Sequence, residues 1–162
     1  MGFYIIYVLL SPIIWLIILL LSCFSSKIRK NYFLFYKHLQ ITKQYISINK
    51  NNKEVLLFHA ASVGEYEQLQ PILRLIDRNK YYIIQSFTSP SIFNKEKDTA
   101  LYDASCYHPF DLPWLSIYFF LSLKPTKYII TRHDIWPGHI VIAKIFKISL
   151  YYINGNIHQD SI

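Results

Sequence analysis

Apolar and polar residues alternate in short blocks along residues 54–153 of the chain. Apolar runs bounded by polar or turn residues predict strands at 55–59, 81–87, 105–108, 128–131 and 149–153. The segments between them have helical spacing, and we predict helices at 67–78, 90–101, 112–123 and 137–146. Strict alternation of this kind predicts a parallel sheet covered on both faces and joined by right-handed crossovers. The fold class predicted for residues 54–162 is therefore α/β, with a Rossmann-like parallel sheet.

Two of the predicted helices have further signals. The apolar face of the helix at 67–78 consists of Leu69, Ile72, Leu73 and Ile76. The helix at 112–123 follows Asp111, a residue type that caps helix N-termini, and Pro113 stands at its first position. We therefore expect the Asp111 side chain to cap that helix.

The first 26 residues contain no charged side chain. Residues 2–24 are apolar except for Ser11, Pro12 and Ser22, and the run is long enough to cross the roughly 30 Å core of a bilayer as a helix. A cleaved signal peptide fits poorly, because no basic residue precedes the run. A buried core helix also fits poorly, because the segment has no charged face. We predict a membrane anchor helix over residues 1–26.

Charge is distributed unevenly along the chain. Residues 1–53 contain seven Lys and Arg and no Asp or Glu, whereas residues 54–162 contain ten of each. The positive-inside rule then places the globular part in the cytoplasm and the anchor in the inner membrane, as a single pass or an anchor. Two isolated cysteines, Cys23 and Cys106, suit that reducing compartment. No nucleic acid partner is expected, because the globular part is neutral and has no basic stripe.

Residues 27–53 form a basic, aromatic connector between the anchor and the domain. Its basic side chains attract anionic lipid headgroups, although a solvated linker is an alternative. Phe33, Tyr36, Leu39 and Tyr45 predict one helical face, which packs on the domain or lies among the headgroups.

The strand at 55–59 leads through small residues into a helical pattern, with the sequence FHAASVGE at 58–65. Such turns are where α/β folds present chemistry. Glu65 falls in the first turn of the helix, where the helix dipole favours the ionised carboxylate that a general base needs. Two alternatives stay open. Either Ser62 is the nucleophile of a degraded nucleophile elbow, or Ser62 caps the helix, Glu65 complements its dipole, and neither does chemistry.

The segment HAASVGE resembles the signature of the bacterial Kdo transferases, which attach 3-deoxy-D-manno-octulosonic acid (Kdo) to the lipid A precursor. Further blocks resemble that family in the same order: FTSPS at 87–91, YHPFDLP at 107–113, IWP at 135–137 and NGNIHQDS at 154–161. Five ordered blocks are far more specific than any one motif. The resemblance covers nearly all of the chain, but only the first half of the family's usual length.

The resemblance implies a glycosyltransferase-B architecture, in which two Rossmann-like domains face each other across a cleft. This chain corresponds to the N-terminal, acceptor-side domain of that architecture. The resemblance also implies that Glu65 is the general base for transfer of Kdo from CMP-Kdo to the lipid A precursor, with Asp134 giving electrostatic support. The residues implied in substrate binding are Ser62, Gly64, Thr88, Ser89, Asp111 and Trp136.

The chain departs from the family in one block. The family has E-x-E-L-W-P where this chain has RHDIWP at 132–137, so Arg132 stands at the first carboxylate position and Asp134 at the second. The reversed charge weighs against full activity. The family's donor domain would come after Ile162, so we do not expect this chain to transfer Kdo by itself. An inactive remnant, one half of a split enzyme and a membrane-binding module are the alternatives.

Two other kinds of site are less well supported by the sequence. The histidines match no metal-ligand spacing, and neither G-x-G-x-x-G nor a P-loop is present, so no metal or other cofactor is expected. A serine hydrolase would use, in chain order, Ser62, then Asp111 or Asp134, then His139 or His158. The elbow lacks its first glycine, and the chain is short for that fold.

Overall fold

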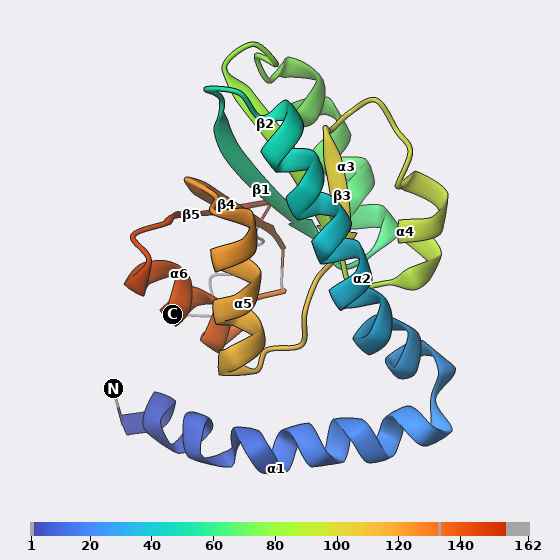
Figure 1. Ribbon diagram of the computed structural model, residues 1–162, viewed down its shortest axis with the longest axis vertical. Helices are drawn as coiled ribbons and strands as arrows, with labels where there is room; N and C mark the ends of the chain where they lie inside the picture. The colour runs from blue at the N-terminus through green and yellow to red at the C-terminus, as the bar shows by residue number, and fades with distance from the viewer. Residues whose placement is uncertain (1, 133, 155–162) are drawn as a thin grey trace.

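The structure, a computed structural model, describes residues 2–132 and 134–154 (Figure 1). Its helices are α1 (Gly2–Phe24), α2 (Ser26–Asn49), α3 (Val63–Leu75), α4 (Pro90–Glu96), α5 (Pro113–Leu123) and α6 (Pro137–Ile145). Its strands are β1 (Glu54–Ala60), β2 (Tyr81–Phe87), β3 (Ala104–Tyr107), β4 (Lys127–Thr131) and β5 (Ser149–Ile153). His133, His158 and most of the block at 154–161 lie outside the described residues.

The strands form one parallel sheet in the order β3-β2-β1-β4-β5, which confirms the predicted α/β fold. Central β1 pairs with β2 on one side and β4 on the other, so that Leu57 lies opposite both Ile84 and Tyr128. The chain moves outward from β1 to β3 and then returns to the other side of β1 at β4. Such a reversal leaves a crevice at the carboxyl ends of the strands, where open α/β sheets bind ligands. The loops after β1 and β4 flank this crevice, which we call the switch point of the sheet.

The boundaries of two helices differ from the predicted ones. Helix α3 begins at Val63 because Ser62 caps it, and it ends at Leu75 instead of continuing to residue 78. Within α3, Leu69 and Leu73 are buried as expected, but Ile72 is exposed. Helix α4 ends at Glu96 instead of at residue 101. The polar residues 94–98 give that segment no apolar face to bury, so little favours continuing the helix.

The connector is a long helix, α2, that packs on the sheet edge at β3 and on α5. Its buried face shares only Leu39 with the predicted one. Phe35 and Leu39 are buried, whereas Phe33 and Tyr45 are exposed. The buried stripe also includes two polar residues that bond to backbone carbonyls of the sheet domain. Asn31 donates to the Thr88 carbonyl and Thr42 donates to the Ser105 carbonyl, each at 2.8 Å.

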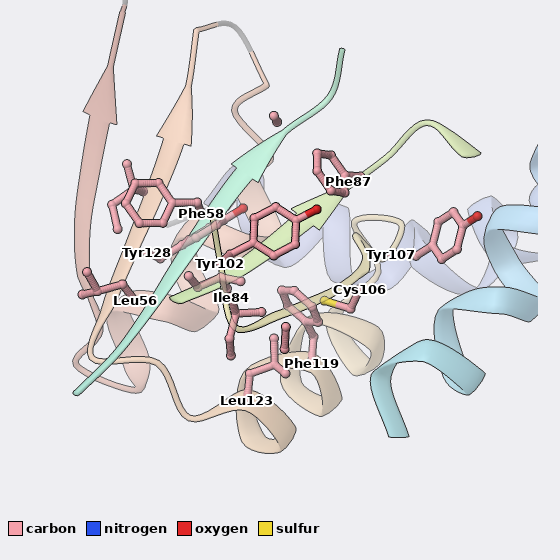
Figure 2. Packing of buried hydrophobic residues seen from close by; sticks show 14 of the residues in the cluster. Leu56, Phe58, Ile84, Phe87, Tyr102, Cys106, Tyr107, Phe119, Leu123 and Tyr128 are labelled. Atoms are coloured by element: carbon pink, nitrogen blue, oxygen red, sulfur yellow. The ribbon is translucent and has the colours of Figure 1, made fainter. Parts of the chain in front are cut away.

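The core lies between the sheet and its helices. Figure 2 shows part of it, with Phe119 and Leu123 from α5 and Ile84 and Cys106 from the strands. Burying each side chain of this size stabilises the fold by about 1.5–3 kcal/mol relative to leaving it in water. Burial also raises the pKa of the Cys106 thiol, so this cysteine is a packing residue and not a reactive thiolate.

Helix α1 is long and apolar enough over Ile5–Phe24 to cross a membrane, by length and composition alone. It is the one helix of this kind in the described part of the chain. The chain turns sharply after it, because Ser25 is extended and caps α2 by accepting from the Ile28 N–H. In Figure 1, α1 runs across below the domain and α2 rises from its C-terminal end.

Candidate active site

Ser62 and Glu65 form a linked pair of caps at the start of α3. The Ser62 hydroxyl accepts from the Glu65 backbone N–H at 3.3 Å, and Glu65 Oε2 accepts from the Ala61 backbone N–H at 2.7 Å. This arrangement closely resembles a capping box. It fixes the half-buried Glu65 carboxylate at the positive end of α3, just after β1. The hydrogen bond to Ala61 engages Oε2, while the caps set the direction of the whole side chain.

His59, the last-but-one residue of β1, links this strand to the loop after β4. Its ring is fully buried, and its Nε2 contacts Asp134 Oδ2. Its Nδ1 lies 3.1 Å from the Ser86 hydroxyl, which donates to the Phe58 carbonyl at 3.0 Å. The contact holds the Asp134 carboxylate, whose side chain is 17% exposed, over the switch point between β1 and β4.

Three buried imidazoles stack beneath this edge. The His59 and His108 ring centroids are 3.7 Å apart, and those of His108 and His139 are 4.6 Å apart. Burial, followed by the neighbouring His59 and His139, holds the pKa of His108 well below its usual value. Each ring nitrogen of a neutral His108 has a hydrogen-bond partner. Its Nδ1 lies 3.2 Å from the Ser86 hydroxyl, and its Nε2 lies 3.4 Å from the Tyr128 hydroxyl. The stack therefore acts as packed structure with fixed hydrogen bonds.

Asp111 lies at the far end of the stack and does not cap α5 as predicted. The N-cap of α5 is Leu112, which makes no side-chain cap. Asp111 instead caps α6, because its two oxygens accept from the backbone N–H groups of Gly138 and His139, each at 2.9 Å. Burial raises the pKa of Asp111, but nearby His139, the Gly138 N–H and the Tyr7 hydroxyl together hold it below its usual value. Asp111 is thus an ionised, buried cap.

Gly138 is required for that cap. A Cβ atom at this position would lie 2.4 Å from Asp111 Oδ1. Gly64, beside the caps of α3, is different, because a Cβ there would meet nothing within 4 Å. The sequence block that contains Asp111 is therefore tied to the block that contains Trp136 through backbone contacts that only glycine permits.

The family model described as 3-deoxy-D-manno-octulosonic acid transferase (Kdo transferase) matches residues 34–162. The chain belongs to the Kdo transferase family. It is 31% identical over 111 residues to the 3-deoxy-D-manno-octulosonic acid transferase of Aquifex aeolicus, an alignment that covers 67% of this chain and 31% of that protein. It is 28% identical over 105 residues to the enzyme of the same name from Haemophilus influenzae, covering 62% and 24%. The chain therefore spans between about a quarter and a third of the length of these relatives.

The Kdo transferase block at 132–137 begins with a residue in a strained backbone conformation. Arg132, at the first carboxylate position of the family block, has a left-handed backbone with φ of 55° and donates its backbone N–H to the Ile153 carbonyl at 3.0 Å. Trp136 is the half-buried N-cap residue of α6. The Arg132 Nε and Trp136 Nε1 atoms are buried without a hydrogen-bond partner among the described residues. The described residues therefore leave the hydrogen-bonding capacity of both donors unused.

Thr88 and Ser89 lie between β2 and α4, next to the start of α2. The Thr88 hydroxyl is buried without a partner in the described part of the molecule, and Ser89 is the N-cap residue of α4 without a side-chain cap. A shallow cavity of about 250 Å³ is lined by Ser26, Lys30, Ser89, Pro90 and Ser91. The structure thus places these hydroxyls on the α2 side of the domain.

Sequence reasoning identified Ser62 and Glu65 as a unit but missed His59 as the partner of Asp134. The available signal was a histidine at the end of an otherwise apolar strand, which must find a partner when it is buried. No group of three or more His, Cys, Asp or Glu side chains in residues 2–132 and 134–154 is arranged to hold a metal ion. The Ser62 hydroxyl is engaged with the Glu65 N–H, and no described hydrogen bond links it to a histidine.

Proposed function

We propose that this chain carries the acceptor-side machinery for transfer of Kdo from CMP-Kdo to the lipid A precursor at the cytoplasmic face of the inner membrane. The proposal rests above all on the position of Glu65. Its carboxylate is fixed by the Ala61 N–H at the positive end of α3, beside the switch point of the sheet. Membership of the Kdo transferase family supports the reaction type.

In the proposed reaction, Glu65 acts as the general base. An acceptor hydroxyl oxygen attacks the anomeric carbon of Kdo, and the bond from that carbon to the CMP phosphate oxygen breaks. The hydroxyl proton passes to the Glu65 carboxylate, and the electron pair leaves with CMP. The hydrogen bond from Ala61 to Oε2 orients the base, which reduces the cost of reaching the reactive geometry.

Asp134 is proposed to give electrostatic support from across the switch point. Its position is set by buried His59, so little rearrangement is needed when substrate binds. Substrate binding is proposed for Ser62, Thr88, Ser89 and Trp136, which lie on the loops after β1, β2 and β4, and for Gly64 in the first turn of α3. Asp111 lies at the same edge of the sheet. Both of its oxygens already accept from backbone N–H groups of α6, so its proposed contribution to substrate binding is to hold the start of α6 in place.

The test uses a chimera, because the chain spans at most about a third of its relatives. Residues 1–162 are joined to the part of the Aquifex aeolicus enzyme that follows its matched segment, and Kdo addition is followed by the mass of the lipid A precursor. Glu65→Gln should abolish transfer while keeping the cap to Ala61, because an amide oxygen still accepts that bond. Ser62→Ala should reduce transfer only in part, because it removes a proposed substrate contact and a helix cap but leaves the base in place. Full transfer by the Gln variant, with the parent chimera active, would exclude Glu65 as the base.

A second candidate is a membrane-bound module without catalysis. Arg132 at a family carboxylate position favours it, because a positive charge there reverses the local field. The chimera separates the two candidates. If the parent chimera is folded and membrane-bound but inactive, and Arg132→Glu restores transfer, the chain is a relative that lost activity through this residue.

A further inference from the structure

One stripe of α1 packs against the domain for most of the length of the helix. Tyr7, Trp15 and Ile18 are partly buried, and Ser11 and Ser22 are only 1% and 8% exposed. From Tyr7 to Ser22 the stripe covers about 22 Å of helix at 1.5 Å per residue. A helix that left the domain to cross a bilayer would contact it at one end only.

The contacts along this stripe are specific and come from separate parts of the domain. The Trp15 indole N–H donates to the Tyr32 hydroxyl at 3.1 Å, and the Trp15 ring meets the Trp114 ring edge-on at 6.3 Å. Tyr7 is hydrogen-bonded to the Asp111 side chain. Trp114 and Asp111 both follow β3, so α1 lies along the carboxyl edge of the sheet, the same edge that presents Asp134.

The opposite stripe of α1 is apolar and open. Leu9, Ile13, Leu16, Leu20 and Phe24 are 72%, 55%, 54%, 65% and 88% exposed, and residues 1–26 contain no charge. Water is a poor solvent for such a continuous surface. Just beyond its C-terminal end, the exposed basic residues Arg29 and Lys30 lie near the start of α2, and the net charge of residues 1–53 is +7. The surface therefore complements an anionic lipid leaflet.

Crossing the bilayer would break this structure. The hydrocarbon core is about 30 Å thick, so a spanning α1 would have to leave Tyr32, Asp111 and Trp114 or carry them into lipid. Lying flat keeps every contact and buries only the open stripe. We propose that α1 is an in-plane membrane helix, with its Leu9–Phe24 stripe in an anionic leaflet and its Tyr7–Ser22 stripe on the domain.

This placement has a consequence for the proposed transfer but does not depend on it. With α1 lying flat, the carboxyl edge of the sheet faces the bilayer surface at a fixed distance. An acceptor embedded in the leaflet then reaches that edge without leaving the membrane.

The depth of single labelled cysteines in vesicles tests the proposal. The full chain, with Cys23→Ser as background, is bound to vesicles of phosphatidylethanolamine and phosphatidylglycerol, and one cysteine at a time is introduced at Leu9, Leu16 or Leu20 and labelled with an environment-sensitive fluorophore. Lipids brominated at different acyl positions report depth. We expect all three sites at one shallow depth, about 5–10 Å below the headgroup boundary. A matched Ser11→Cys variant on the inner stripe should be shielded from the quenching lipids.

Each other outcome overturns the proposal. Depths that run from one interface through the bilayer centre to the other, with Ser11→Cys quenched like its neighbours, mean that α1 spans the membrane. No lipid quenching at any outer site, together with a doubled mass in solution, means that a second copy of the chain covers the stripe. Far-ultraviolet circular dichroism of each labelled variant checks that the fold is kept.

Discussion

The carboxylate of Asp111 caps a helix that begins 26 residues later, by accepting from the backbone N–H of Gly138 at 2.9 Å. The contact ties the loop after β3 to the start of α6, and it exists only because Gly138 has no Cβ. It also leaves α5, the helix next to Asp111 in sequence, without a side-chain cap. Asp111 therefore caps a helix that is distant in sequence instead of the adjacent one, and this contact fixes the edge of the candidate site.

Gly138→Ala should destabilise the fold. The new Cβ would lie 2.4 Å from Asp111 Oδ1, so the buried carboxylate must move off its two donors. We expect a loss of about 1–3 kcal/mol, measured by chemical denaturation in detergent. Gly64→Ala is the matched control, because its Cβ meets nothing within 4 Å. That change should be neutral or stabilising by up to about 1 kcal/mol. Equal effects of the two substitutions would contradict the cap.

Stability should fall as the pH drops below about 6.5, the ordinary value for histidine. Burial lowers the pKa of both His108 and His139 in the folded state, so the unfolded chain binds protons that the folded chain does not. Each such histidine contributes a slope of at most about 1.4 kcal/mol per pH unit, only between its ordinary pKa and its lowered pKa in the folded chain, and no slope above that window. The pKa of Asp111 is lowered in the folded chain, so protonation of Asp111 reduces the folding stability only at a pH below the ordinary pKa of an aspartate.

His108→Asn should remove one of these slopes. Denaturation midpoints of the parent and the variant, measured from pH 5 to pH 8, give the comparison. The variant will be less stable at neutral pH because it loses ring packing, and only the change of slope reports the titration. An unchanged slope would mean that His108 is already protonated in the folded chain.

Ser62→Ala and Glu65→Gln should separate structure from chemistry. Loss of the Ser62 cap should cost about 0.5–2 kcal/mol of folding free energy, because the Glu65 N–H loses its acceptor. Glu65→Gln should cost less, since its amide oxygen still accepts from Ala61. For Kdo transfer by the chimera we expect the opposite ranking, in which Glu65→Gln reduces transfer more than Ser62→Ala does. A parallel loss of stability and transfer in both variants would mean that Glu65 only caps the helix.

His59→Gln should affect transfer through Asp134. The amide restores part of the hydrogen bonding to Ser86 but does not hold the Asp134 carboxylate as the imidazole does. We expect a reduced kcat in the chimera with a smaller change in KM, and a pH profile that differs from the parent's. Asp134→Asn should show a similar loss, and combining the two changes should add little, because both remove one pair. Additive losses would show that the residues act separately.

The local features of this protein follow from its sequence. The order of strands and helices, the apolar run of α1 and the pairing of Ser62 with Glu65 depend on residues close together in the chain, and periodicity and capping rules apply at that range. The ordered sequence blocks also resemble the Kdo transferase family, to which the chain belongs.

Tertiary structure decided which partner each buried group takes. Phe35 is buried and Phe33 is exposed, because only one stripe of α2 meets β3 and α5. Asn31 and Thr42 on that stripe donate to backbone carbonyls of the domain. Asp111 caps α6 instead of α5, and His59 holds Asp134, which is 75 residues away. Local rules do not determine these choices, because a buried polar group must pair with whatever donor or acceptor the packed strands and helices bring to it.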